Sequence, residues 1–218
     1  MLFRSPDFER QQAQGTVPKH PLRYCLAHHR KGIVLGFAIS ALGSITYYVG
    51  ITYVPTFLTS AGALSESEAL PLATYAAVVV ILVTPFIGAL SDFGGRKPVL
   101  ALLCLGSAGL PIAMFALMAS GAQAQALLGA LVLAALGGGV SAVGAVATAE
   151  QFPGEGRLSG LALGATLATA IFGGLTPYIA QVLIARTGSP MVPGAMIALV
   201  ALCVLPFLLC MPETKPGP

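Results

Sequence analysis

The chain has 218 residues, of which 56% are hydrophobic and 9% are charged, and its mean hydropathy is +0.86. Roughly a quarter of the residues of a soluble domain are charged, so this composition excludes a soluble protein and predicts an integral membrane protein. The net charge of +3 does not indicate nucleic-acid binding, because the basic residues lie in short flanks beside apolar runs, where membrane topology accounts for them. The four cysteines form no Cys-x-x-Cys pair and predict neither a disulfide framework nor a metal site.

Residues 1–31 are charged and contain no apolar segment, which excludes a secretory signal peptide. We expect them to form a cytoplasmic lead-in. All three histidines of the chain lie in this segment, at His20, His28 and His29. An intramembrane enzyme needs histidines, paired carboxylates or metal ligands within its spans. We therefore predict no catalytic residue, no cofactor and no enzymatic activity.

Six uncharged runs follow, and each is long enough to cross about 30 Å of hydrocarbon as a helix. They cover residues 32–58, 70–90, 98–117, 126–148, 158–185 and 191–211. The prediction is an all-α membrane protein in which six transmembrane helices form one bundle over residues 32–211. A cytoplasmic tail, residues 212–218, would follow it.

Basic residues gather at alternate ends of these runs. They are Lys19, Arg23, Arg30 and Lys31 before the first run, Arg96 and Lys97 after the second, Arg157 after the fourth, and Lys215 after the last. The other set of loops contains only Arg186. The positive-inside rule then predicts that both termini are cytoplasmic and that the loop with Glu66 and Glu68 faces outward in the cell membrane.

A short polar segment, residues 88–97, separates the second run from the third. Its sequence is Gly-Ala-Leu-Ser-Asp-Phe-Gly-Gly-Arg-Lys. A six- to eight-residue link between antiparallel helices has to turn sharply, and Gly94 and Gly95 can adopt the positive φ that such a turn needs. Gly88 would let a facing helix approach closely. The carboxylate of Asp92 can meet free backbone donors of the next helix, its dipole, or a neighbouring arginine.

The spacing Gly-x-x-x-Asp-x-x-Gly-Arg-Lys between two spans resembles the signature loop of the major facilitator superfamily, whose members are twelve-helix secondary transporters. In that superfamily the loop acts as a conformational latch. The resemblance assigns this role to Gly88, Asp92, Gly95, Arg96 and Lys97; the alternative is a charged turn that only anchors topology. A basic residue often follows the aspartate in the family, and here Phe93 stands in its place.

Further segments resemble the second half of metabolite:proton symporters, which carry citrate, ketoglutarate, proline or betaine. They are Ser5-Pro6-Asp7-Phe8-Glu9, residues 47–55, Glu150-Gln151-Phe152-Pro153 with Arg157, residues 162–164 and residues 170–177. The resemblance implies a C-terminal six-helix half with an internal three-plus-three repeat. Its second cytoplasmic loop would contain Glu150 and Arg157. The implied partners are the lipid bilayer, a small organic acid or zwitterion, and an N-terminal six-helix half or a second copy.

Hydroxyl groups recur at helical spacing in two of the runs and are candidates for a substrate cavity. The candidates are Ser44, Tyr47, Tyr48, Thr52, Thr166 and Thr169. Such hydroxyls either line a cavity or hydrogen-bond to neighbouring helices. Family members often carry an aromatic residue and Asn after the glycine that is here Gly164, whereas this chain has Ala165 and Thr166. Substrate identity is therefore not implied by the resemblance.

No Asp, Glu, Lys, Arg or His lies inside any of the six runs. Proton relays and ion sites in membranes are usually built from such residues, so the coupling carboxylate of a symporter would have to come from outside this chain. Two alternatives remain open beside the half-transporter. One is a six-helix chain that self-associates into a carrier or channel for neutral solutes, and the other is an inactive truncated remnant.

Overall fold

The structure, a computed structural model, describes residues 13, 20–61, 64–152 and 157–214 of the chain. Six described segments are long and apolar enough to cross a membrane, which confirms the predicted all-α membrane fold. We number them spans 1 to 6: Arg30–Thr52, Glu66–Gly94, Arg96–Met118, Gln123–Glu150, Leu158–Thr187 and Val192–Cys210. Residues 1–12 and 14–19 of the predicted lead-in, which include Lys19, lie outside the described residues, as do 215–218 of the predicted tail.

Four spans are single helices and two are interrupted. The single helices are α5 (Glu66–Gly94), α6 (Arg96–Met118), α7 (Gln123–Glu150) and α11 (Val192–Cys210). Span 1 consists of α3 (Arg30–Tyr47) and the π-helix η1 (Tyr48–Thr52), with α2 (Pro21–His28) before it and α4 (Val54–Ser60) after it. Span 5 runs through α8 (Arg157–Leu161), η2 (Ala162–Thr166), α9 (Leu167–Thr169), η3 (Ala170–Leu175) and α10 (Thr176–Thr187). The second π-helical distortion of span 5, η3, thus ends directly before α10, whose second residue is Pro177.

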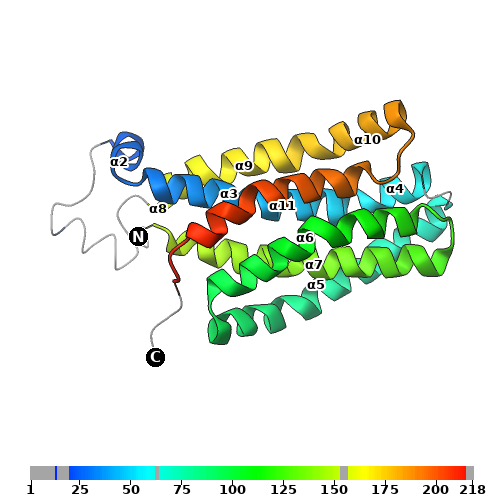
Figure 1. Ribbon diagram of the computed structural model, residues 1–218, viewed down its shortest axis with the longest axis horizontal. Helices are drawn as coiled ribbons and strands as arrows, with labels where there is room; N and C mark the ends of the chain where they lie inside the picture. Colours follow the sequence, from blue (N-terminus) through cyan, green and yellow to red (C-terminus); the bar gives the residue numbers. More distant parts are fainter. Residues whose placement is uncertain (1–12, 14–19, 62–63, 153–156, 215–218) are drawn as a thin grey trace, which may run out of the picture.

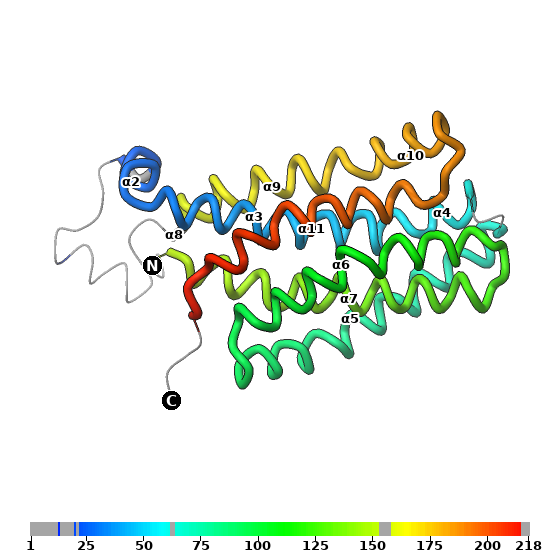
Figure 2. The backbone as a smooth tube through the Cα atoms, viewed as in Figure 1, coloured from blue at the N-terminus to red at the C-terminus, as the bar shows by residue number. Residues whose placement is uncertain are grey.

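The spans lie side by side and alternate in direction (Figure 1). The α5–α6 connection and the last turn of α11 lie at the same end of the bundle as α2, and we call this the α2 end. The α6–α7 and α10–α11 connections lie at the opposite end with α4. α5 and α10 form opposite edges of the bundle, and α3 and α7 run between them (Figure 2).

The contacts between spans follow a three-plus-three symmetry. Span 4 packs on spans 1, 2 and 3, and span 1 packs on spans 4, 5 and 6. Span 1 corresponds to span 4, span 2 to span 5, and span 3 to span 6. The contact of span 2 with span 4 then corresponds to that of span 5 with span 1, and the contact of span 3 with span 4 to that of span 6 with span 1; all four contacts are observed. Because three spans carry the chain to the other side of the membrane, the second triplet is inverted relative to the first, as in one half of a facilitator fold.

Three consecutive glycines place span 4 at the centre of the bundle. A Cβ built at Gly137 would lie 3.1 Å from the carbonyl oxygen of Thr46 in span 1, one at Gly138 would lie 3.3 Å from Val80 in span 2, and one at Gly139 would lie 3.2 Å from Leu103 in span 3. Each glycine therefore admits a different neighbour and lets three spans pack closely on span 4. In an apolar 18-residue window of each span, 61% of the residues of span 4 are buried, whereas only 11% and 22% are buried in spans 2 and 5.

Candidate functional site

The α5–α6 connection is much tighter than the predicted six- to eight-residue link. α5 ends at Gly94 and α6 begins at Arg96, so a single residue reverses the chain. That residue, Gly95, has φ 98° and ψ 151°, a backbone conformation that is essentially restricted to glycine. Positive φ is thus confirmed at Gly95, whereas Gly94 has none because it is still part of α5. The short turn brings the last turn of α5 directly beside the first turn of α6.

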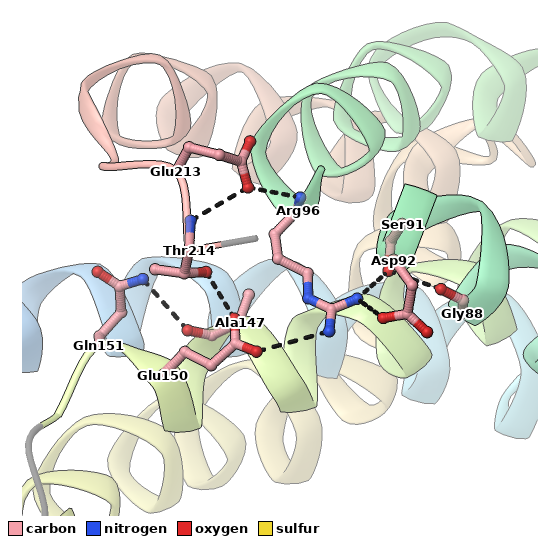
Figure 3. Close-up of polar contacts among 9 residues, drawn as sticks. All are labelled: Gly88, Ser91, Asp92, Arg96, Ala147, Glu150, Gln151, Glu213 and Thr214. Atoms are coloured by element: carbon pink, nitrogen blue, oxygen red, sulfur yellow. Dashed lines mark hydrogen bonds and ion pairs between the residues drawn. The ribbon is translucent and has the colours of Figure 1, made fainter. Parts of the chain in front are cut away.

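Arg96 lies at the centre of a polar cluster at the α2 end (Figure 3). Its side chain is only 7% exposed. The Nη1 atom donates to the Oγ of Ser91 over 2.6 Å and to the Oδ1 of Asp92, and the Nη2 atom lies 3.5 Å from the Oε1 of Glu150. Of the three partners considered for Asp92 from the sequence, the structure has the neighbouring arginine. One buried cation therefore joins the end of α5, the start of α6 and the end of α7.

Glu213, from the segment after α11, takes the place at the helix terminus that was considered for Asp92. Its Oε1 accepts the backbone N–H of Arg96 over 2.7 Å, and its Oε2 accepts that of Lys97 over 3.2 Å. The two N–H groups lie in the first turn of α6, at the positive end of its dipole, where no carbonyl of the same helix can accept them. The next residue, Thr214, donates its hydroxyl to the Oε2 of Glu150 over 2.5 Å. Glu213 and Thr214, which follow α11, thus connect the tail to the start of α6 and to the end of α7 (Figure 3).

Lys97, Gly88 and Arg157 have different positions relative to this cluster. Lys97 takes part through its backbone N–H. The carbonyl of Gly88 accepts the Ser91 hydroxyl over 2.9 Å, but no atom lies within 4 Å of a Cβ built at Gly88. Among the described residues no helix approaches Gly88 closely, so the close approach of a facing helix there stays a prediction. Arg157 begins α8, and its side chain lies outside what the structure describes.

Phe152, just beyond Glu150, fixes the end of α7 against spans 1 and 5. Its ring is 1% exposed, and it lies where Cβ atoms at Gly32, Gly36 and Gly160 would approach within 3.2, 3.4 and 2.2 Å. At Gly160 a Cβ would overlap the ring, so only glycine leaves room for it there. Nearby, a Cβ at Gly164 would lie 3.0 Å from the carbonyl oxygen of Ile33. Gly160 and Gly164 therefore form a close-packing surface of span 5.

A groove of about 580 Å³ lies between spans 1, 4 and 5. Three of the predicted cavity residues line it, namely Ser44, Thr166 and Thr169. The hydroxyls of Ser44 and Thr169 are hydrogen-bonded to each other over 2.9 Å, so this pair also links span 1 to span 5. Ser40, Ser141 and Thr148 add further hydroxyls to the lining. None of the residues that line the groove is ionisable.

The structure places the other three predicted cavity residues, Tyr47, Tyr48 and Thr52, away from this groove. The ring of Tyr48 packs against Gly173, where a Cβ would lie 2.8 Å from it, and Tyr47 is 41% exposed. Thr52 is also exposed. The π-helix η1 (Tyr48–Thr52) accounts for Thr52, because its extra residue per turn rotates the side chains that follow Tyr48 away from the line expected for an α-helix.

Comparison with known proteins identifies the family. The model of the family described as "Sugar (and other) transporter" matches residues 7–217. The chain belongs to this family. It is therefore a member of the major facilitator superfamily and a multi-pass membrane protein, and its curated relatives fall in the metabolite:proton symporter branch.

Among the relatives of this transporter-family chain is the ectoine/proline transporter of Corynebacterium glutamicum, 31% identical over 88% of this chain and 38% of the relative. The citrate-proton symporter of Klebsiella pneumoniae is 34% identical over 79% of this chain and 39% of the relative. The alpha-ketoglutarate permease of Escherichia coli is 30% identical, with corresponding shares of 82% and 42%. These relatives are transporters and not enzymes, in agreement with the prediction. The chain spans about 40% of their length.

Proposed function

We propose that this chain is one six-helix bundle of a secondary active transporter that moves a small organic acid or zwitterion by alternating access, coupled to protons. It would be the C-terminal bundle, with its termini in the cytoplasm, and would work against an N-terminal six-helix bundle. The relatives are named as transporters of ectoine and proline, of citrate with protons, and of alpha-ketoglutarate, which supports this solute class. The observation that carries the proposal is the hydroxyl-lined groove between spans 1, 4 and 5.

The lining of the groove fits a shared binding site. Ser44, Thr166 and Thr169 offer hydroxyls that can donate to a carboxylate or accept from an ammonium group. Since the lining has no ionisable side chain, the counter-charge for an ionic solute and the titrating group for proton coupling would come from the facing bundle. The groove would then form one wall of a cavity between two bundles.

The low burial of two spans supports a facing bundle. Spans 2 and 5 are the least buried of the six, and the internal symmetry makes them equivalent. A second bundle placed on the symmetry axis would contact both of them in the same way. Exposed apolar side chains on α5, such as Ile81 at 69% and Phe86 at 73% exposure, would be covered by that bundle or by lipid.

The cluster around Arg96 supports alternating access with a latch at the α2 end. Gly88, Asp92, Gly95, Arg96 and Lys97 would form the latch, with Glu150 as the acceptor from α7. Asp92 is 58% exposed, whereas Arg96 is buried, so Asp92 is the member of the ion pair that can be reached by another bundle. We propose that Arg157 extends this cytoplasmic surface.

Uptake measurements test the proposed function. The complete chain is fused behind the half of the Corynebacterium transporter that it does not match, and uptake of labelled citrate, alpha-ketoglutarate, proline and ectoine is followed with and without an inward proton gradient. We expect gradient-driven uptake of at least one solute, reduced by Thr166→Val and Thr169→Val but not by Thr187→Val, whose hydroxyl bonds to the Leu183 carbonyl outside the groove. Uptake that is equal for all three variants would refute the groove as the solute site.

A second candidate function follows from the uncharged lining of the groove. Two copies of the chain could assemble face to face and conduct a neutral solute, since a cavity without fixed charge suits neutral solutes better than ions. The discriminating observation is uptake of a neutral solute by proteoliposomes that contain the chain alone. No uptake by the chain alone or by the fusion, despite insertion of both, would favour an inactive remnant.

A further inference from the structure

A second groove lies on the opposite side of α3 from the hydroxyl-lined one. Its inner part, about 320 Å³, is lined only by apolar side chains and a thiol of spans 1, 5 and 6, among them Phe37, Phe172, Leu199 and Cys203. Its outer part, about 400 Å³, reaches the α2 end and is lined by Arg30, Lys31, Val34, Leu35, Phe207 and Cys210. Val34 and Phe207 line both parts, so the two parts adjoin at these side chains. We call this the α3–α11 groove.

The α3–α11 groove is separate from the proposed solute site. On α3, its inner part is lined by Val34, Phe37, Ala38 and Ala41, which recur three and four residues apart and share one face. The hydroxyl-lined groove uses Ile39, Ser40, Gly43 and Ser44, which lie on the other side of the same helix. One face of α3 therefore offers hydroxyls, and the other offers hydrocarbon that ends in two positive charges.

The length of the α3–α11 groove matches one leaflet of a bilayer. On α3 it extends from Arg30 to Ala41, and on the antiparallel α11 from Cys210 to Leu199, eleven residue steps in each case. At about 1.5 Å per residue this is about 16 Å, and half of a hydrocarbon core of about 30 Å is about 15 Å. A single acyl chain would therefore run the whole groove while its headgroup stayed at the surface.

The helix α2 indicates where that surface lies. It is seen end-on while the spans run along the picture, so it lies across the bundle axis (Figure 2). Leu22 and Leu26, one turn apart, are 54% and 50% exposed on it, and Arg23 is exposed beside them. A short helix with exposed leucines and an arginine is typical of the membrane interface. Arg30 and Lys31 follow α2 directly and would therefore lie at headgroup depth.

The two basic side chains are available for a ligand. The Nε atom of Arg30 donates to the carbonyl of Leu26 over 2.7 Å, which holds the guanidinium at the mouth of the groove. Within the described residues, no carboxylate forms an ion pair with Arg30 or Lys31. Both are exposed. Basic pockets between spans at the cytoplasmic side of a membrane suit anionic lipid headgroups.

We propose that the α3–α11 groove binds an anionic phospholipid. One acyl chain lies between spans 1, 5 and 6, and the phosphate contacts Arg30 and Lys31. The two basic side chains at the mouth of the groove favour a negatively charged headgroup, and the apolar side chains along its length favour an acyl chain. Since each basic side chain near a membrane surface contributes about a fivefold preference, the pair gives a preference of about thirtyfold over a zwitterionic lipid.

Native mass spectrometry of the purified full-length chain tests this proposal, with phosphatidylglycerol and phosphatidylcholine of identical acyl chains as probes. We expect phosphatidylglycerol to be retained in preference, and the double variant Arg30→Gln, Lys31→Gln to lose that preference by about thirtyfold. Arg23→Gln is the matched control, because it removes an exposed charge from the same end without touching the groove. All three residues are exposed, so the variants are expected to fold.

A second pair of variants tests the hydrocarbon part. Cys203→Phe adds a ring inside the groove, and Leu102→Phe adds one at a position that is 65% exposed on α6. Only Cys203→Phe should weaken lipid retention, and inorganic phosphate should not displace the lipid. Equal retention of both lipids, an equal loss in Arg23→Gln, an unaltered Cys203→Phe variant, or displacement by inorganic phosphate would each overturn the proposal.

Discussion

Two adjacent glycines at the α5–α6 junction are predicted to respond in opposite ways to the same substitution. Gly95→Ala forces alanine into a conformation at φ 98°, ψ 151°, which costs about 1–3 kcal/mol. The new Cβ would also lie 2.7 Å from the Oε2 of Glu213, so the carboxylate that accepts from Arg96 has to move. Gly94→Ala places a methyl group in a helical turn, 3.9 Å from Val99, and is expected to stabilise by up to about 1 kcal/mol.

The cysteines of the chain provide an assay for this prediction, since the chain has no tryptophan. Cys25 and Cys104 are buried, and Cys203 and Cys210 are exposed. In a background in which both exposed cysteines are alanine, a thiol-reactive fluorophore therefore reports unfolding on heating. A loss of about 2 kcal/mol corresponds to a fall of about 4–8 °C in the midpoint for a chain of this size.

The comparison of the two variants controls for the general effect of alanine on helix stability and for the effect of detergent on the unfolding midpoint. Both variants add the same methyl group and leave the net charge unchanged, so only the backbone conformation and the contact with Glu213 distinguish them. A lower midpoint for Gly95→Ala alone would support the reasoning. Equal shifts in the two variants, or an unchanged midpoint in Gly95→Ala, would refute it.

Two further substitutions test other contacts with the same assay. Arg96→Gln removes the cation that pairs with Asp92 and Glu150, so we expect the unfolding midpoint to fall. Adding Glu150→Gln should reverse part of this fall, because it removes a carboxylate that has lost its partner. Gly164→Ala should lower the midpoint more than Gly43→Ala, since its Cβ would lie 3.0 Å from a backbone oxygen of span 1 whereas nothing lies within 4 Å at Gly43. A separate labelling test uses the chain with Cys210 retained: burial raises the pKa of the Cys25 thiol, so in the folded chain it should be labelled far more slowly than exposed Cys210 at pH 8, and equally fast after unfolding.

The sequence predicts the spans well because an uncharged run is itself the physical requirement for crossing hydrocarbon. Their ends are predicted less well. Residues 70–90 were expected to form the second span, but α5 extends from Glu66 to Gly94. The added residues carry charge, and Glu68 accepts the backbone N–H of Ser65 at the N-terminus of the helix. Hydropathy marks the part of a helix that is in lipid, whereas capping decides where the helix begins.

The candidate site was predicted where its contacts are local and missed where they are distant in sequence. Asp92 and Arg96 are four residues apart, so the spacing in a short turn already suggests their pairing. Glu213 lies 117 residues after Arg96, and no sequence periodicity connects a tail to the start of a helix. Its signal was indirect, an acidic residue directly after the last span. The misplacement of Thr52 has another cause, since it ends a π-helix, and a π-helix cannot be recognised from side-chain spacing alone.

The Arg96 cluster separates two effects that a single charge substitution would confuse. Glu150 and Glu213 contact Arg96 or its backbone from within the bundle, at the end of α7 and from the segment after α11. Their removal should therefore change the stability of this bundle. Asp92 is the exposed partner, so Asp92→Asn should leave insertion and most of the stability intact and instead slow the transport cycle of a complete carrier. If Asp92→Asn in the fused carrier lowers stability as much as Arg96→Gln and transports at the rate of the parent, the cluster is a structural tie of one bundle and not a latch between two.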